Sequence, residues 1–160
     1  KIRWKQLSKH DDTELITRLL GRKPLAEYEV VVKDDTGQPL VIKNAPICFD
    51  GTPMPTLYWL IDPIMRAKIS RIEAAGGISQ AEKEIDPQEL ELVHKEYAKE
   101  RETKIEEGYL GPKPYGGVGG TRIGVKCLHA HYAYLLAGGK DPVGEWVEAK
   151  LEEEKTDQKK

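Results

Sequence analysis

The chain has 160 residues, which is enough for one domain with a single hydrophobic core but too few for two ordinary domains. Charged residues make up 32% of the chain, yet 25 basic residues are balanced by 27 acidic ones. No overall positive field therefore exists to attract nucleic acid or an anionic membrane, and we expect neither as a partner. Any charged ligand must be held by a local cluster of side chains.

The cysteine content and the apolar runs indicate a soluble cytoplasmic protein. Cys48 and Cys127 can form at most one disulfide and are not spaced as a disulfide framework, so a reducing compartment is expected. The apolar run TLYWLI is far shorter than the roughly 20 residues that span a bilayer. We expect no membrane insertion.

The first third of the chain predicts a short helix and three strands. Asp11 or Asp12 supplies the N-cap of the helix, and leucine and isoleucine then recur at helical spacing until a glycine and a proline end it. Two β-branched runs, 28–33 and 39–43, flank an Asp-Asp-Thr-Gly turn and predict a hairpin. The run 56–61 is apolar on both faces, which is typical of a strand covered on each side.

A loop rich in proline joins the hairpin to the third strand. The stretch APICFDGTPMPT contains three prolines and one glycine, which favour a rigid connection without regular structure. It carries Asp50 and Thr52, two polar side chains that we expect to face a ligand.

Four more helices are predicted from their capping residues. Asp-Pro pairs at positions 62, 86 and 141 supply an N-cap followed by proline at the first helical position, and glycine pairs at 76 and 138 supply stops. The predicted helices cover about 62–77, 86–107, 125–137 and 141–153. Residues 154–160 are predicted to be a charged, disordered tail, which leaves 1–153 as one domain. The predicted fold is α+β, with a small, mostly antiparallel sheet packed by four to five helices.

The helix over 86–107 carries two polar residues on its core-facing stripe. At about 100° per residue, His94 and Arg101 lie on the same face as the apolar side chains. Both need partners, because an unpaired buried charge costs several kcal/mol. We expect Arg101 to bind an anion, or a carboxylate such as that of Asp50, and His94 to shuttle a proton. The alternative is a buried ion pair that only fixes helix packing.

Residues 108–124 contain seven glycines in seventeen positions, which predicts a long connection without secondary structure. Its free N–H groups precede a helix start, and Arg122 and Lys126 add positive charge, as in an anion cradle. The segment matches neither the P-loop pattern nor the dinucleotide pattern. Anion binding and a flexible flap are therefore both open interpretations.

The stretch VKCLHAHYAYLLAGG places Cys127, His129 and His131 at alternating positions. On one continuous helix over 125–137, Cys127 and His131 lie about 40° apart around the axis and their side chains can meet. His129 points about 160° away from His131. The three residues therefore do not form one three-ligand metal site.

Three roles are open for Cys127. It can be a small buried thiol beside a core histidine, His131. It can bind zinc together with His131, although zinc needs three or four ligands. The missing ligand would then come from Cys48, His94, Asp50 or His10. Finally, a helix N-terminus and the positive charge of Lys126 and Arg122 can activate it as a nucleophile. No cofactor is predicted, and zinc is the alternative.

Four blocks of the sequence resemble the bacterial domain-of-unknown-function family 501. They are FDGTPMPTLYWLIDP, ISRIEAAGG, HKEYAKER and VKCLHAHYAYLLAGGKDPVG, and the resemblance covers about residues 15–147. The resemblance implies that the gene for this protein lies near the genes for enolase, a septum-formation initiator and an exopolyphosphatase-like protein. The resemblance does not assign a catalytic role to any residue. Asp62 stands where relatives often carry cysteine, which weakens any scheme with a third cysteine ligand.

The first functional hypothesis is a cleft that binds a small anionic ligand, with turnover of that ligand left open. The 50–56 loop, the His94/Arg101 face, the 108–124 segment and the helix start at Cys127 are expected to form it. The predicted ligand-binding residues are Asp50, Thr52, Arg101, Arg122, Lys126, His129 and His131, and the candidate catalytic residues are Cys127 and His94.

Two alternatives belong to other classes of protein. One is a non-catalytic module that contacts a protein partner through exposed aromatic residues around Tyr109, Tyr115 and Trp146, linked to cell division or envelope housekeeping. The other is a zinc-stabilised domain that uses Cys127 and His131.

Overall fold

The structure is a computed structural model that describes residues 13–159. Residues 13–20 are helical, and the predicted cap residues Asp11 and Asp12 lie outside the described part of the chain. The remaining elements are, in order, β1 (Tyr28–Lys33), β2 (Pro39–Asn44), β3 (Tyr58–Leu60), α2 (Pro63–Ala74), α3 (Gly77–Glu84), α4 (Pro87–Glu102), η1 (Val118–Gly120), α5 (Leu128–Leu136) and α6 (Pro142–Gln158). This arrangement confirms the predicted α+β fold.

The three strands form one antiparallel sheet with β2 in the centre. The predicted turn closes the hairpin: Asp34 Oδ1 accepts hydrogen bonds from the N–H groups of Thr36 and Gln38, at 2.9 Å each. Gly37 follows the turn with a φ of 88°, a conformation that glycine adopts without strain. β3 is shorter than the predicted 56–61 strand, because part of its backbone is bound to a side chain of α4 instead.

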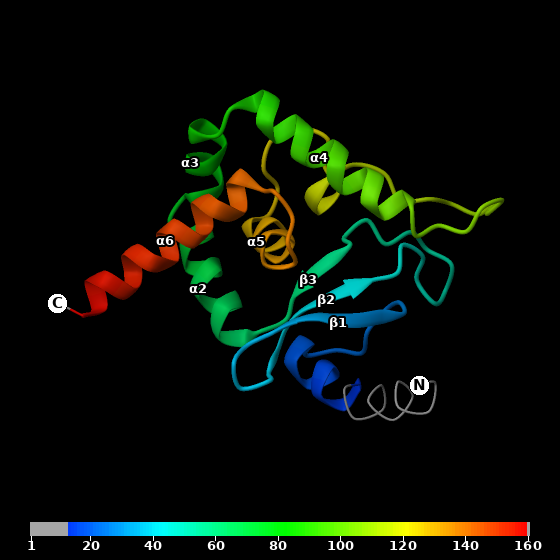
Figure 1. The fold of residues 1–160 in the computed structure, drawn as a ribbon, viewed down its shortest axis with the longest axis horizontal. Helices are drawn as coiled ribbons and strands as arrows, with labels where there is room; N and C mark the ends of the chain where they lie inside the picture. Colours follow the sequence, from blue (N-terminus) through cyan, green and yellow to red (C-terminus); the bar gives the residue numbers. More distant parts are fainter. Residues whose placement is uncertain (1–12, 160) are drawn as a thin grey trace.

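Both faces of the sheet are covered, as the apolar pattern of the third strand predicts. On one face, Ile16 of the N-terminal helix packs with Ile42 and Ile61 in a small cluster. On the other face, Val41 and Leu60 join the main core, to which the other helices contribute. Figure 1 shows α5 near the centre of this main core, with α2, α4, α6 and β3 around it.

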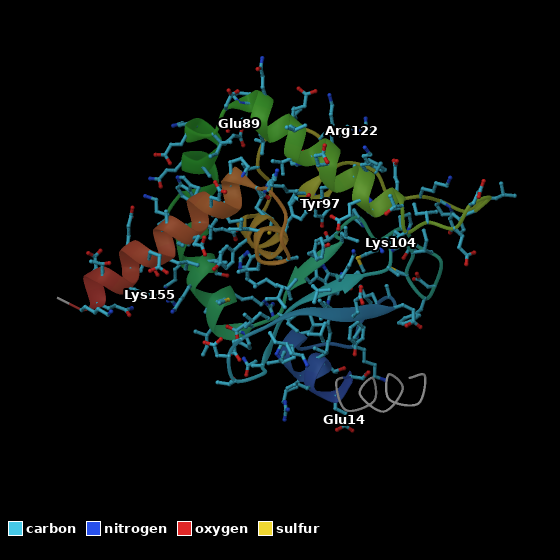
Figure 2. The ribbon with its side chains drawn as sticks, in the orientation of Figure 1. Glu14, Glu89, Tyr97, Lys104, Arg122 and Lys155 are labelled. Atoms are coloured by element: carbon cyan, nitrogen blue, oxygen red, sulfur yellow. The ribbon has the colours of Figure 1, made fainter. Side chains whose placement is uncertain are left out.

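Tyr97 of α4 binds the sheet through its hydroxyl. The oxygen accepts hydrogen bonds from the backbone N–H groups of Leu57, at 2.6 Å, and Tyr58, at 3.2 Å. The ring is fully buried and meets the ring of Tyr134 edge-on at 5.0 Å between centroids. Figure 2 shows Tyr97 on the inner side of α4, whereas the exposed Lys155 lies near the C-terminal end of α6. Tyr97 therefore fixes the distance between α4 and the start of β3.

The three predicted Asp-Pro caps are confirmed. Asp62 accepts a hydrogen bond from Met65 N at 2.9 Å, Asp86 from Gln88 N at 2.8 Å, and Asp141 from Val143 N at 2.9 Å. Each carboxylate satisfies a backbone donor that has no partner within its own helix. No helix in residues 13–159 combines the length and hydropathy needed to cross a bilayer.

The glycine pair at 76 and 77 joins two helices rather than ending the helical region. Gly76 leaves α2 with a φ of 91°, and Gly77 begins α3 directly. A Cβ atom on Gly77 would lie 2.6 Å from Ile72 O, so this close approach requires glycine. α3 was not predicted from the sequence. At the other end, α6 continues through 154–158, residues that the sequence analysis assigned to a tail.

Removing the Tyr97 hydroxyl should destabilise the fold without changing its topology. In Tyr97→Phe, two buried N–H groups lose their acceptor, and the free energy of unfolding should fall by about 1–3 kcal/mol. Urea unfolding followed by circular dichroism measures this change. Tyr115→Phe, at a ring that is 72% exposed, is the control and should match the wild type. Equal loss in both variants would contradict the role given to Tyr97.

Candidate functional site

The helix that follows the glycine-rich segment begins at Leu128, three residues later than predicted. Cys127 is its N-cap in an extended conformation, with φ −150° and ψ 120°, and its side chain makes no capping hydrogen bond. Glu73 of α2 caps the helix instead, since its Oε2 accepts a hydrogen bond from Leu128 N at 2.8 Å. The prediction of one continuous helix over 125–137 was therefore wrong. The predicted face shared by Cys127 and His131 depended on that helix and is wrong as well.

His131 belongs to a buried pair with Asp141. Its Nδ1 lies 2.6 Å from Asp141 Oδ2, and both side chains are fully buried. The other oxygen of Asp141 caps α6. The pair therefore ties α5 to the start of α6, and His131 is a structural core histidine.

Cys127 lies beside His129, with Glu73 as the third member of the cluster. Sγ of Cys127 is 3.8 Å from Nδ1 of His129, and Oε1 of Glu73 is 3.3 Å from the same nitrogen. One ligand atom from each side chain lies within 4.8 Å of the other two. We call these three residues the thiol–imidazole cluster.

The other ring nitrogen of His129 is held by α2. Nε2 lies 3.1 Å from Arg66 O and 3.2 Å from Ser70 Oγ. A carbonyl only accepts, so Nε2 carries the proton that it donates to Arg66. The hydrogen bond with Cys127, the Arg66 carbonyl and the charge of Glu73 raise the pKa of His129 above its ordinary value of 6.5, against the lowering effect of burial.

A pocket of about 630 Å³ opens over this cluster, between α2, β3 and the start of α5. Its lining residues are Thr56, Tyr58, Trp59, Leu60, Pro63, Arg66, Ala67, Ser70, Gly119, Lys126, Cys127, His129 and Ala130. Two of these are cationic and none is acidic. A second pocket, of about 930 Å³, lies between α4 and the 137–145 turn, and five of its lining residues are acidic. The charges at the two pockets are therefore opposite.

His94 is not at this pocket. It is 3% exposed, and both of its ring nitrogens are bound by the backbone of the glycine-rich segment. Nδ1 accepts a hydrogen bond from Val118 N at 3.0 Å, and Nε2 donates one to Gly124 O at 2.8 Å. This fixes a neutral ring. Burial lowers the pKa of His94 below its ordinary value of 6.5. The hydrogen bond to the Gly124 carbonyl opposes this shift, and the smaller effects of His131 and Asp141 lower and raise the pKa, respectively.

Arg101 has a related role about two helical turns further along α4. It is 1% exposed, with Nη1 donating to Pro55 O and Nη2 to Gly116 O, both at 2.8 Å. The guanidinium therefore links the proline-rich loop to the glycine-rich segment. Its expected partner, Asp50, lies elsewhere. We call His94 and Arg101 together the α4 clamp.

The part of the glycine-rich segment that forms η1 is packed against α4 and α5. Around η1, three of its N–H groups have protein acceptors: Gly117 N bonds to Thr121 O, Gly120 N to Gly117 O, and Val118 N to His94 Nδ1. A Cβ on Gly117 would lie 2.4 Å from the His94 ring, so glycine permits the close contact. These N–H groups do not form an anion cradle.

The remaining predicted ligand-binding residues lie apart from the pocket. Asp50 Oδ1 accepts hydrogen bonds from Thr52 N, at 3.0 Å, and Thr52 Oγ1, at 2.7 Å, which closes an exposed turn and lowers the pKa of Asp50. Arg122 stacks over the Tyr115 ring at 5.7 Å. His10, a candidate metal ligand, lies outside the described residues. Of the predicted site residues, the pocket brings together Lys126, Cys127 and His129.

Sequence reasoning missed three contributors to the site, all on α2. Arg66, Ser70 and Glu73 follow one another at spacings of four and three residues, so they share one helical face. That spacing was a readable signal for a polar face. The sequence did not show that this face packs against the start of α5, because the contact spans more than fifty residues.

The geometry defines an α+β protein with a thiol, an imidazole and a carboxylate grouped beside a cationic pocket. A family model described as "Protein of unknown function (DUF501)" matches residues 30–149, and the chain belongs to this family. The resemblance drawn from the sequence blocks is thereby confirmed. No curated protein and no solved structure matches the chain.

Replacing His94 should change how stability depends on pH. The folded pKa of His94 is lowered, so as the pH falls below 6.5 the unfolded chain binds the proton first and the folded state loses stability. In His94→Asn this part of the loss disappears, while the free energy of unfolding at pH 7.5 falls by about 1–3 kcal/mol, since one backbone bond is lost. Urea unfolding of both proteins between pH 5 and 7.5 measures the slopes. If the free energy of unfolding depended on pH equally in the two proteins, the lowered pKa of His94 would be contradicted.

Proposed function

We propose that the pocket over the thiol–imidazole cluster binds a small anionic ligand, such as a carboxylate or a phosphate. The observation that carries this proposal is the charge of the lining. Arg66 and Lys126 lie at the pocket, and none of the described residues that line it is acidic, in a chain with more acidic than basic residues. Such local charge attracts anions even where the net charge of the protein does not.

The polar and apolar walls indicate what kind of anion fits. Ser70 adds a hydroxyl donor to the two cations, and Arg66 offers planar, paired donors that suit carboxylate and phosphate oxygens. The guanidinium is anchored by Nη1, which donates to Leu19 O at 3.3 Å. Trp59, Leu60 and other apolar residues complete the lining, which supports a ligand with an organic part as well as a charged one.

This site differs from the cleft expected from the sequence. It retains Thr56 of the proline-rich loop, Gly119 of the glycine-rich segment and the helix start at Cys127. It excludes the α4 clamp, in which both His94 ring nitrogens and both Nη atoms of Arg101 are bound to backbone groups. Cys127 is therefore the one predicted catalytic residue that lies at the pocket, while His94 acts as a positioning residue for the segment that closes it.

Reversing the charge of Lys126 should weaken anion binding. Charge-assisted hydrogen bonds contribute roughly 1.5–3 kcal/mol, so the Kd for inorganic phosphate or acetate should rise at least about tenfold in Lys126→Glu. Amide shifts of Gly119 and Cys127 in an NMR titration report the binding.

The control is Lys113→Glu, which makes the same change in net charge at an exposed lysine outside the pocket lining. It should bind like the wild type. If the Kd rose equally in both variants, the effect would come from the net charge of the protein and not from the pocket. If the amide shifts of the wild type did not change with added anion, the proposed site would be refuted.

A second candidate, a protein-interaction module, is favoured by exposed apolar side chains on the glycine-rich segment. Leu110 is 98% exposed, Ile123 80% and Tyr115 72%. Such residues are enriched at interfaces. Trp146, expected on this surface, is instead half-buried and donates a hydrogen bond to Glu84.

The test of this second candidate is capture of a partner. A specific protein retained by the wild type, and lost when Leu110, Tyr115 and Ile123 are replaced by serine, would support it. Retention by the triple variant at unchanged affinity would contradict it.

A further inference from the structure

We infer that Glu73, Cys127 and His129 form a binding site for a divalent metal ion of the zinc class, with its open coordination position facing the pocket. The three side chains come from two elements, α2 and the start of α5, which pack against each other. The inference goes beyond anion binding and does not depend on it, because the three ligand atoms lie together whether or not an anion is bound.

The distances within the cluster fit a common tetrahedral centre. With bond lengths of about 2.0–2.1 Å to nitrogen and oxygen and about 2.3 Å to sulfur, a tetrahedral ion separates its N and O ligands by about 3.3 Å and its S and N ligands by about 3.6 Å. The observed separations are 3.3 Å for His129 Nδ1 and Glu73 Oε1, and 3.8 Å for Cys127 Sγ and His129 Nδ1. The third pair, the Cys127 thiol and the Glu73 carboxylate, lies within 4.8 Å, so metal binding requires this pair to close by at most about 1.2 Å.

The hydrogen bonds around the cluster orient the ligand atoms toward one point. Because Nε2 of His129 donates to Arg66 O, the neutral ring has its lone pair on Nδ1, where the thiol and the carboxylate lie. Metal-binding histidines are held in this way, with the second nitrogen donating to a carbonyl or carboxylate. Glu73 is oriented similarly, since Oε2 is bound to Leu128 N and Oε1 is directed to His129.

The donor set selects the class of metal. A thiolate and an imidazole favour zinc and similar first-row ions over magnesium or calcium, which prefer oxygen ligands alone. In the described residues both cysteines are free thiols, so Cys127 is not consumed by a disulfide. On binding, Cys127 loses its proton to solvent and Sγ donates an electron pair to the ion.

The burial of the cluster indicates an open site. The side chains of His129 and Glu73 are 23% and 22% exposed, and Cys127 is half-buried. Cys127 and His129 both line the pocket. Three protein ligands with one position open to a pocket is the composition of catalytic zinc sites, whereas structural sites are closed by four. A water molecule or the anionic ligand would take the fourth position.

Metal titration of the untagged chain in a phosphate-free buffer with a non-thiol reductant tests the inference. The wild type should bind one Zn²⁺, and Co²⁺ in its place should give a thiolate-to-metal charge-transfer band. Cys127→Ser should lose the band and stoichiometric binding. Glu73→Gln keeps the acceptor for Leu128 N, and it should lose stoichiometric zinc without unfolding.

Cys48→Ser is the matched control, because it removes the other free thiol, which lies away from the cluster, and it should behave like the wild type. Absence of uptake by the folded wild type overturns the site. The site is also overturned if Cys127→Ser keeps the cobalt charge-transfer band or if Cys48→Ser loses that band. Stoichiometric binding of zinc by Glu73→Gln would overturn it as well. Lys126→Glu should retain zinc while losing phosphate affinity, which separates failure of the metal site from failure of the anion site.

Discussion

A long segment without regular secondary structure has backbone groups that need partners, and in this protein the α4 clamp supplies them. His94 takes one N–H and one carbonyl of the glycine-rich segment, while Arg101 takes a further carbonyl from it and one from the proline-rich loop. Buried backbone groups without partners would each cost about as much as a lost hydrogen bond. The clamp therefore holds Gly119 and Lys126 where they border the pocket, although neither of its own side chains reaches it.

The features that depend on neighbouring residues could be predicted from the sequence. The hairpin turn and the three Asp-Pro caps are local, because the side chain and the backbone group it binds are only two to four residues apart. The polar stripe of α4 was also visible, since helical periodicity places His94 and Arg101 on the buried face. Their partners were not visible, because those partners are main-chain carbonyls and amides that have no signature in the sequence.

The error at Cys127 has a similar physical origin. Helical spacing predicts a pair with His131 only if the helix already includes Cys127, but the first turn is set by the Glu73 carboxylate from another helix. With Cys127 extended, its side chain turns toward His129. A single long-range capping bond thus decides which histidine the thiol meets. The carboxylate that makes this bond belongs to the cluster, and the cations of Arg66 and Lys126 lie at the pocket.

The sheet separates two hydrophobic clusters of unequal size, and this has a consequence for motion. Among residues 13–159, the cluster around Ile16 contains three fully buried residues, far fewer than the main core. The N-terminal helix can therefore be released by a local opening that leaves the rest folded. Amide hydrogen exchange in that helix is accordingly governed by this partial opening rather than by global unfolding. The bond between Leu19 O and Arg66 crosses from the helix to the pocket. Each opening event frees the guanidinium of Arg66, which makes the electrostatics of the pocket sensitive to the docking of the N-terminal helix.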